Sequence, residues 1–192
     1  MVYNYEENEE LTISLNLANP KDRFLSLYPV PRESKKNNVT WNLVFKGNET
    51  LQFAENHKLY PYLFWESCDN NNVIVLKEFV CVRNEEVEEK LDAILESKGL
   101  NCKERCDMIT YWLAELKASE FVKIGFLDEK LYNQYFPLEV TPLPKNMLRV
   151  FMLFENCEFE EKSTVLSGRF LENKQFNRNG PTIIEWGGMN MI

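Results

Sequence analysis

The stretch "MLRVFMLF" (residues 147–154) is apolar at every position except Arg149. A run this dense in aromatic and aliphatic residues is typical of an interior β-strand. The prolines of "PLEVTPLP" (residues 137–144) fix extended backbone just before it. We therefore expect a sheet with this strand in its interior.

Other segments carry the two-residue period of strands. In "LTISLNL" (residues 11–17) apolar and polar residues alternate, which predicts a strand with one wet face. "FLSLYPV" (residues 24–30) is a second candidate. "TWNLVF" and "TLQFA" flank "KGNE", where Gly47 and Asn48 can adopt positive φ, so we expect a hairpin. "YPYLFWES" and "VIVLKEFVCV", separated by "CDNNN", predict a second hairpin.

Three segments have the pattern of helices. "EEVEEKLDAILESK" (residues 85–98) has Asn84 as a candidate N-cap and Gly99 just past its end. Asn101 and Glu104 have the spacing of a capping box before "CDMITYWLAEL" (residues 106–116), so a tight αα-hairpin is expected. After the strand-like "FVKIGFL", "EKLYNQYF" (residues 129–136) predicts a short third helix.

The order of these elements predicts an α+β fold. We expect a largely antiparallel, sandwich-like β-sheet with an inserted αα-hairpin and a short third helix. A length of 192 residues suits a single globular domain, residues 1–192. Within it, residues 1–10 are expected to be a flexible acidic N-terminus, and residues 155–180 a long loop or arm.

Charge and composition argue against several classes of protein. The chain has 30 Asp and Glu against 22 Lys and Arg, a net charge of −8 that disfavours nucleic-acid binding. No apolar run is long enough for a membrane helix, and the acidic residues 1–10 lack the basic and apolar regions of a classical secretion signal. Five scattered cysteines favour reduced thiols. We expect a soluble protein in the cytoplasm, or in a particle assembled there.

Recognised cofactor and metal motifs are absent from the sequence. The seven glycines form no phosphate-binding loop, and His57, the only histidine, lies in a polar segment typical of a turn. Cys102 and Cys106 lack the second cysteine knuckle of a structural zinc site. We therefore expect neither a cofactor nor a metal.

Carboxylates remain as candidates for chemistry. Glu66 and Glu185 each lie beside a tryptophan at the end of an apolar strand, where desolvation can raise a carboxyl pKa. Arg149 interrupts an apolar strand. If the three met, they would form a general acid-base site or a ligand clamp; the alternative is a buried structural ion pair between Arg149 and one glutamate.

Four segments together resemble a family: "YPYLFWES", "ERCDMITYWLAEL", "LRVFMLFE" and "NGPTIIEWGG". They are similar to landmark motifs of a widespread family of uncharacterised proteins, with Y-L-F-W-E, a Y-W-L helix, R-V-F-M and a closing V-V-E-W-G-G. The resemblance covers residues 60–188 and implies a shared fold without an activity. It places Glu66, Trp112, Arg149, Glu185 and Trp186 at landmark positions.

Two functional hypotheses follow from these observations. The first is a non-enzymatic structural or interaction protein, such as a minor component of a large assembly like a virus capsid, with protein partners bound through the 155–180 arm. The alternative is a small-molecule or glycan binding protein, or a hydrolase, that uses a cleft of Glu66, Glu185 and Arg149. The absence of a catalytic motif favours the first.

Overall fold

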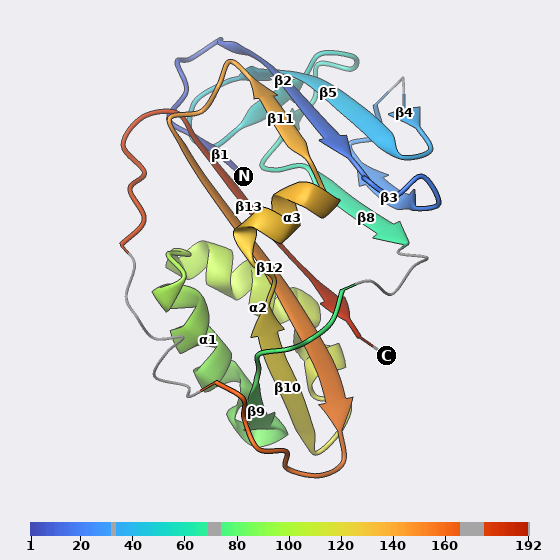
Figure 1. The fold of residues 1–192 in the computed structure, drawn as a ribbon. Helices are drawn as coiled ribbons and strands as arrows, with labels where there is room; N and C mark the ends of the chain where they lie inside the picture. The colour runs from blue at the N-terminus through green and yellow to red at the C-terminus, as the bar shows by residue number, and fades with distance from the viewer. Residues whose placement is uncertain (32–33, 69–73, 166–174, 192) are drawn as a thin grey trace. The chain divides into compact units, whose positions relative to one another are not determined.

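A computed structural model describes residues 1–31, 34–68, 74–165 and 175–191 (Figure 1). The chain forms two compact units and passes between them several times. The first unit comprises Met1–Val73, Glu129–Leu148 and Asn177–Glu185, and the second comprises Ile74–Asp128, Arg149–Phe176 and Trp186–Ile192.

The first unit contains a six-stranded sheet and a two-stranded sheet. The larger sheet has the strand order β11-β2-β5-β6-β7, with β4 also paired to β5, and the smaller sheet pairs β3 with β8. The bounds are β1 Val2–Tyr3, β2 Glu10–Asn16, β3 Arg23–Tyr28, β4 Ser34–Lys35, β5 Asn38–Phe45, β6 Leu51–Phe53, β7 Leu59–Tyr60, β8 Phe64–Cys68, α3 Glu129–Tyr135 and β11 Leu138–Thr141.

The six-stranded sheet buries one face, as the alternation in residues 11–17 predicts. Leu11, Ile13 and Leu15 are buried and lie opposite Leu43, Trp41 and Val39 of β5. The other face is polar: the Thr12 hydroxyl donates to Asn42 Oδ1 at 3.2 Å, and the Ser14 and Thr40 hydroxyls are 2.9 Å apart. Side-chain alternation along each strand separates these two faces.

One predicted hairpin is confirmed and the other is wrong. β5 and β6 pair antiparallel, and the turn between them places Gly47 at φ +75° and Asn48 at φ +46°. The second hairpin does not form, because β8 pairs with β3, and β9 (Val80–Arg83) pairs with β10 (Phe121–Phe126). Adjacency in sequence predicted that pairing, whereas each strand found its partner in a different sheet.

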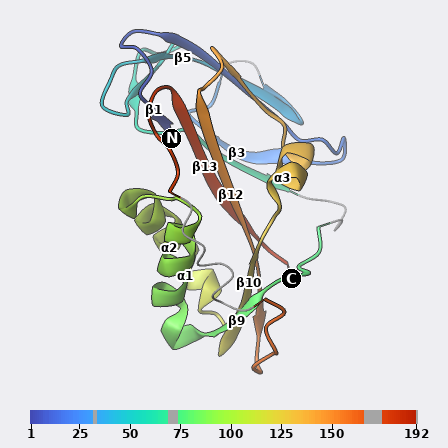
Figure 2. The ribbon, with the colours of Figure 1, turned by 60° about the vertical axis from the view of Figure 1, so that its left-hand side comes forward.

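Two neighbouring strands of the second unit are buried on both faces. β10 lies antiparallel between β9 and β12 (Asn146–Cys157) (Figures 1 and 2). The residues of β12 and of β13 (Thr182–Asn190) are divided between the two units. Six consecutive residues of β12, Arg149–Phe154, are buried. This confirms the interior strand expected at residues 147–154.

Different segments cover the two faces of this sheet. On one face, the Phe154 ring lies 5.4 Å from the Trp112 ring of α2. On the other face, a Cβ atom added at Gly125 of β10 would overlap the carbonyl oxygen of Glu78 and the Leu76 side chain. The segment before β9 therefore crosses β10 at a glycine, because no larger residue leaves room for its backbone.

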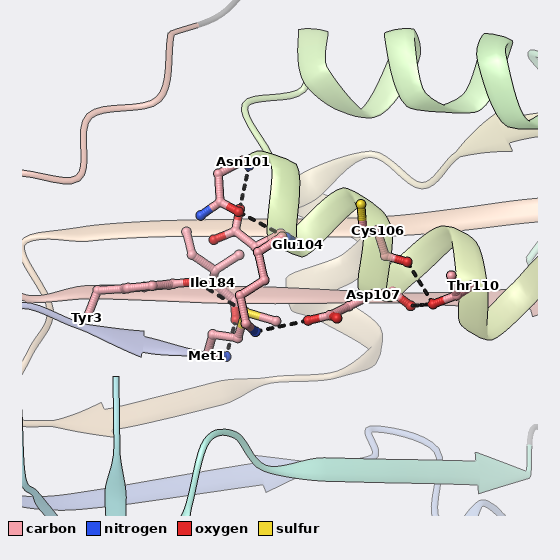
Figure 3. A network of polar contacts seen from close by, with 9 residues as sticks. Met1, Tyr3, Asn101, Glu104, Cys106, Asp107, Thr110 and Ile184 are labelled. Atoms are coloured by element: carbon pink, nitrogen blue, oxygen red, sulfur yellow. Dashed lines mark hydrogen bonds and ion pairs between the residues drawn. The ribbon is translucent and has the colours of Figure 1, made fainter. Parts of the chain in front are cut away.

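The two long helices form the expected pair in the second unit. α1 (Val87–Ser97) packs against α2 (Cys102–Leu116). The capping box is confirmed: Asn101 Oδ1 accepts from the Glu104 amide at 2.9 Å, and Glu104 Oε2 accepts from the Asn101 amide at 2.7 Å (Figure 3). Gly99 ends α1 at φ +93°, as expected.

The expected cap at Asn84 is wrong. Asn84 begins a 3₁₀ turn, η1 (Asn84–Glu86), and α1 starts after it without a side-chain cap. The 3₁₀ turn supplies part of the hydrogen bonding that a capping side chain would otherwise provide at the start of the helix.

The two segments expected to lack regular structure differ from each other. Residues 1–10 include β1, which pairs with β13, and Val2, Tyr3 and Tyr5 are buried, so the flexible N-terminus is corrected. The many acidic residues of this segment gave no indication that Val2, Tyr3 and Tyr5 would be buried. In the 155–180 connection, β12 continues to Cys157, and residues 158–165 and 175–181 contain no helix or strand. Residues 166–174 lie outside the described residues.

The predicted fold class is confirmed. The protein is α+β, with largely antiparallel sheets, an αα-hairpin after β9 and a short third helix, α3. The described pairings between registered strands are antiparallel. The single-domain expectation stays a prediction.

Gly188→Ala should destabilise the protein. An added Cβ would lie 3.1 Å from Trp112 Cε2 and 3.2 Å from the Met152 carbonyl oxygen, closer than ordinary packing allows. We expect a loss of about 1–3 kcal/mol, typical of overpacking, measured by urea denaturation. Trp112→Phe removes the ring atoms nearest to Gly188. The double variant should therefore lose less free energy of unfolding than the two single variants lose together. Equal values would contradict a contact between residue 188 and Trp112.

Candidate functional site

Glu185 is held by a tryptophan of the first unit. Trp65, on β8, donates its indole N–H to Glu185 Oε1 at 3.0 Å. The Trp65 ring also contacts Phe24 at 6.2 Å and Phe136 at 5.4 Å between ring centres. Because both the indole N–H and the ring of Trp65 contact residues of this chain, the contact has the character of a structural pair.

Glu66 lies on the opposite face of the same strand. Its side chain is exposed, and Glu66 Oε2 accepts from the Ser26 hydroxyl of β3 at 3.1 Å. Successive residues of a strand point to opposite faces, so Glu66 points away from the face that Trp65 shares with Glu185. The structure does not bring the two glutamates together on one face.

Arg149 belongs to the second unit, where it is buried at the start of the six-residue buried run of β12. Glu66 and Glu185 belong to the first unit. The proposed meeting of Arg149 with either glutamate, as a cleft or as an ion pair, therefore stays a prediction.

The histidine and the two cysteines considered from the sequence are exposed. His57 is exposed, with φ +56°, in the polar connection between β6 and β7. Cys102 and Cys106 are exposed near the start of α2, and the hydrogen bond that the Cys106 thiol donates to Cys102 raises the pKa of Cys106. In the described part of the chain, no three His, Cys, Asp or Glu residues are grouped as a metal site would require.

A buried lysine in the second unit is a feature that the sequence did not reveal. The Lys123 side chain, on β10, is 10% exposed, and its ammonium lies 2.8 Å from Glu155 Oε1 and 3.0 Å from Glu161 Oε1. These carboxylates raise the pKa of Lys123 against the opposing effect of burial. The carboxylates of Glu155 and Glu161 therefore keep the buried Lys123 ammonium charged.

The segment around Glu161 is fastened to the edge of β9. The Cys81 amide donates to the Ser163 hydroxyl at 2.9 Å, and the Phe79 amide donates to Thr164 Oγ1 at 2.8 Å. Val165 is buried. This described part of the expected arm therefore packs on its own unit, and binding of a partner by the 155–180 arm stays a prediction.

The first unit also has an open depression beside β3, which we call the β3 depression. It has a volume of about 450 Å³. Its lining combines apolar and basic side chains, including Arg23, Leu25, Leu27, Val30, Lys35 and Lys36. The apolar neighbours of these basic residues on β3 could be recognised only with the fold in hand.

None of the family models, curated proteins or solved structures compared with this chain matches it. The resemblance to the Y-L-F-W-E family therefore stays a prediction. Among the described residues, no helix is long and apolar enough to cross a membrane.

Replacing either partner of the Trp65–Glu185 pair should lower the free energy of unfolding. Glu185→Leu leaves the indole N–H without its acceptor and should cost roughly 1–3 kcal/mol, whereas Glu185→Gln keeps an acceptor and should cost less. Chemical denaturation of both variants, with Trp65→Phe to complete a double-mutant cycle, measures the coupling. A coupling near zero would contradict a structural role.

The pH dependence of stability should reveal Cys157, at the end of β12. Burial, helped by the charge and hydrogen bond of Cys81, raises the pKa of the Cys157 thiol from 9.0 to about 11. The unfolded chain therefore loses this proton at lower pH, so stability falls as pH rises from 9.0 to about 11. We expect Cys157→Ala to show a shallower decline in this window. Parallel curves for the two proteins would contradict the prediction.

Proposed function

We propose that this protein is a non-enzymatic interaction protein, a component of a larger protein assembly, and that it contacts a partner protein through β3 and the residues after it. One observation carries the proposal. Leu25 and Val30, which are 53% and 66% exposed, line the same depression beside β3, and the neighbouring Tyr28 is 58% exposed. Single exposed apolar residues are ordinary on protein surfaces, but a cluster of large ones is typical of an interaction surface.

This apolar surface is held in place by the core of the first unit. The buried Trp41 of β5 donates its indole N–H to the Pro29 carbonyl oxygen at 2.7 Å. Pro29 and Pro31, on either side of Val30, are both buried. Tyr28 packs edge-to-face on Tyr60, with ring centres 5.4 Å apart. A surface fixed in this way loses little conformational entropy when a partner binds.

The ligand-cleft alternative has no such supporting observation. Trp65 is engaged with Glu185, and Glu66 is bonded to Ser26 on the other face of β8. An aromatic face that is already packed offers little area for stacking on a sugar. The proposal therefore rests on the exposed surface of β3.

Site-specific photocrosslinking tests the proposed function. A benzophenone amino acid is placed at Leu25 in the full chain, and at Leu131 of α3 as a matched control, because Leu131 is an exposed leucine of the same unit. After illumination in extract of the source cells, Leu25 should form protein adducts of defined mass that Leu131 does not form, identified by mass spectrometry.

A defined adduct should also weaken when the surface is made polar. Val30→Ser, combined with the crosslinker at Leu25, should reduce the adduct several-fold while leaving the unfolding transition in place. Equal adducts from the two crosslinker positions, or an adduct unaffected by Val30→Ser, would rule out β3 as the contact surface.

A further inference from the structure

The β3 depression brings two kinds of side chain together. Leu25 and Leu27 come from β3, and Val30 from the segment after it. Arg23 begins β3, while Lys35 and Lys36 come from the end of β4 and the residue after it. The Lys36 carbonyl oxygen accepts from the Phe24 amide at 3.1 Å, which ties the basic segment to β3.

The cations of this depression stand out in an acidic protein. The described lining includes no Asp or Glu, although the chain has 30 acidic residues and only 22 basic ones. Arg23 and Lys35 form no ion pair with another described residue, whereas Lys123, Arg105 and Lys117 of the second unit are each paired with carboxylates. A local positive charge beside an apolar surface is complementary to an acidic ligand that also carries apolar groups.

The size and openness of the depression favour one class of ligand. A small anion would leave Leu25 and Val30 uncovered, and a nucleic acid would meet three cations in the described lining, on a chain of net charge −8. An extended peptide places alternate side chains on opposite sides and can follow an open depression of about 450 Å³. Its apolar side chains can cover the leucines while acidic ones reach the surrounding cations.

We propose that the β3 depression binds an extended acidic peptide segment of the partner protein. Apolar side chains of the peptide pack on Leu25, Leu27 and Val30, and its carboxylates pair with Arg23 and Lys35. This inference rests on the proposed function and adds the chemistry of the partner. Because the cations are exposed, the affinity is moderate and falls as salt is raised.

Selection from a random peptide library tests this assignment. A phage-displayed library of twelve-residue peptides is selected on the full-length protein, and the most enriched peptide is synthesised with a fluorescent label. We expect enriched sequences in which Asp or Glu alternates with apolar residues. Fluorescence polarisation should show binding that weakens at least fivefold between 50 and 500 mM NaCl, an order-of-magnitude expectation for exposed charge pairs.

Matched charge variants locate the peptide. Arg23→Gln with Lys35→Gln should weaken binding at least fivefold, roughly what the loss of two exposed ion pairs implies. Lys58→Gln with Lys90→Gln removes the same charge at exposed positions outside the depression and should leave the dissociation constant within about twofold. Circular dichroism of both double variants checks that they remain folded.

Three results would overturn the assignment. Enriched peptides without acidic residues would exclude an acidic ligand. If the two double variants weakened peptide binding equally, the effect would come from the net charge of the protein and not from the depression. Tighter binding of phosphatidylserine vesicles or of a 20-nucleotide DNA, lost in Arg23→Gln with Lys35→Gln, would assign the depression to a lipid surface or a nucleic acid. Crosslinking at Leu25 would still succeed if only the acidic chemistry were wrong, so the two proposals fail separately.

Discussion

Burial of both faces of β10 and β12 is the constraint on which the second unit depends. A strand covered on both sides leaves no exposed position for a polar side chain, so the residues of Arg149–Phe154 must be enclosed by other parts of the chain. The helices cover one face, through Trp112. The segments before β9 and after β12 cover the other, which requires Gly125 for close approach and two carboxylates for Lys123.

The main sheet of the first unit differs from that of the second in how its faces are covered. Its main sheet buries one face and leaves the other polar, so the apolar exposure of β3 does not follow from a shortage of core. Trp41 and the buried Pro29 hold this exposed segment rigidly. An apolar surface that the core keeps in position is better explained by an interaction than by loose packing, and this contrast supports an interaction protein over a ligand-binding cleft.

Apart from the cap expected at Asn84, predictions based on local physical chemistry agreed with the structure. The Asn101–Glu104 capping box, the positive φ angles of Gly47 and Asn48 and the one-sided burial of β2 each depend on residues a few positions apart. Predictions of partners were less successful. β8 pairs with β3 across the intervening β4–β7, and the Trp65–Glu185 bond joins residues 120 positions apart, so no local pattern could identify either contact.

Glu185 illustrates what the sequence determines and what only the tertiary structure determines. The sequence by itself determined that Glu185 follows an apolar, strand-like run and lies beside a tryptophan, because strand propensity and adjacency are local properties. Only the tertiary structure decided that this carboxylate meets Trp65 rather than Glu66, and that Gly188 makes room for Trp112. Both outcomes depend on which strands and helices pack together, and packing is settled by the burial of the whole chain.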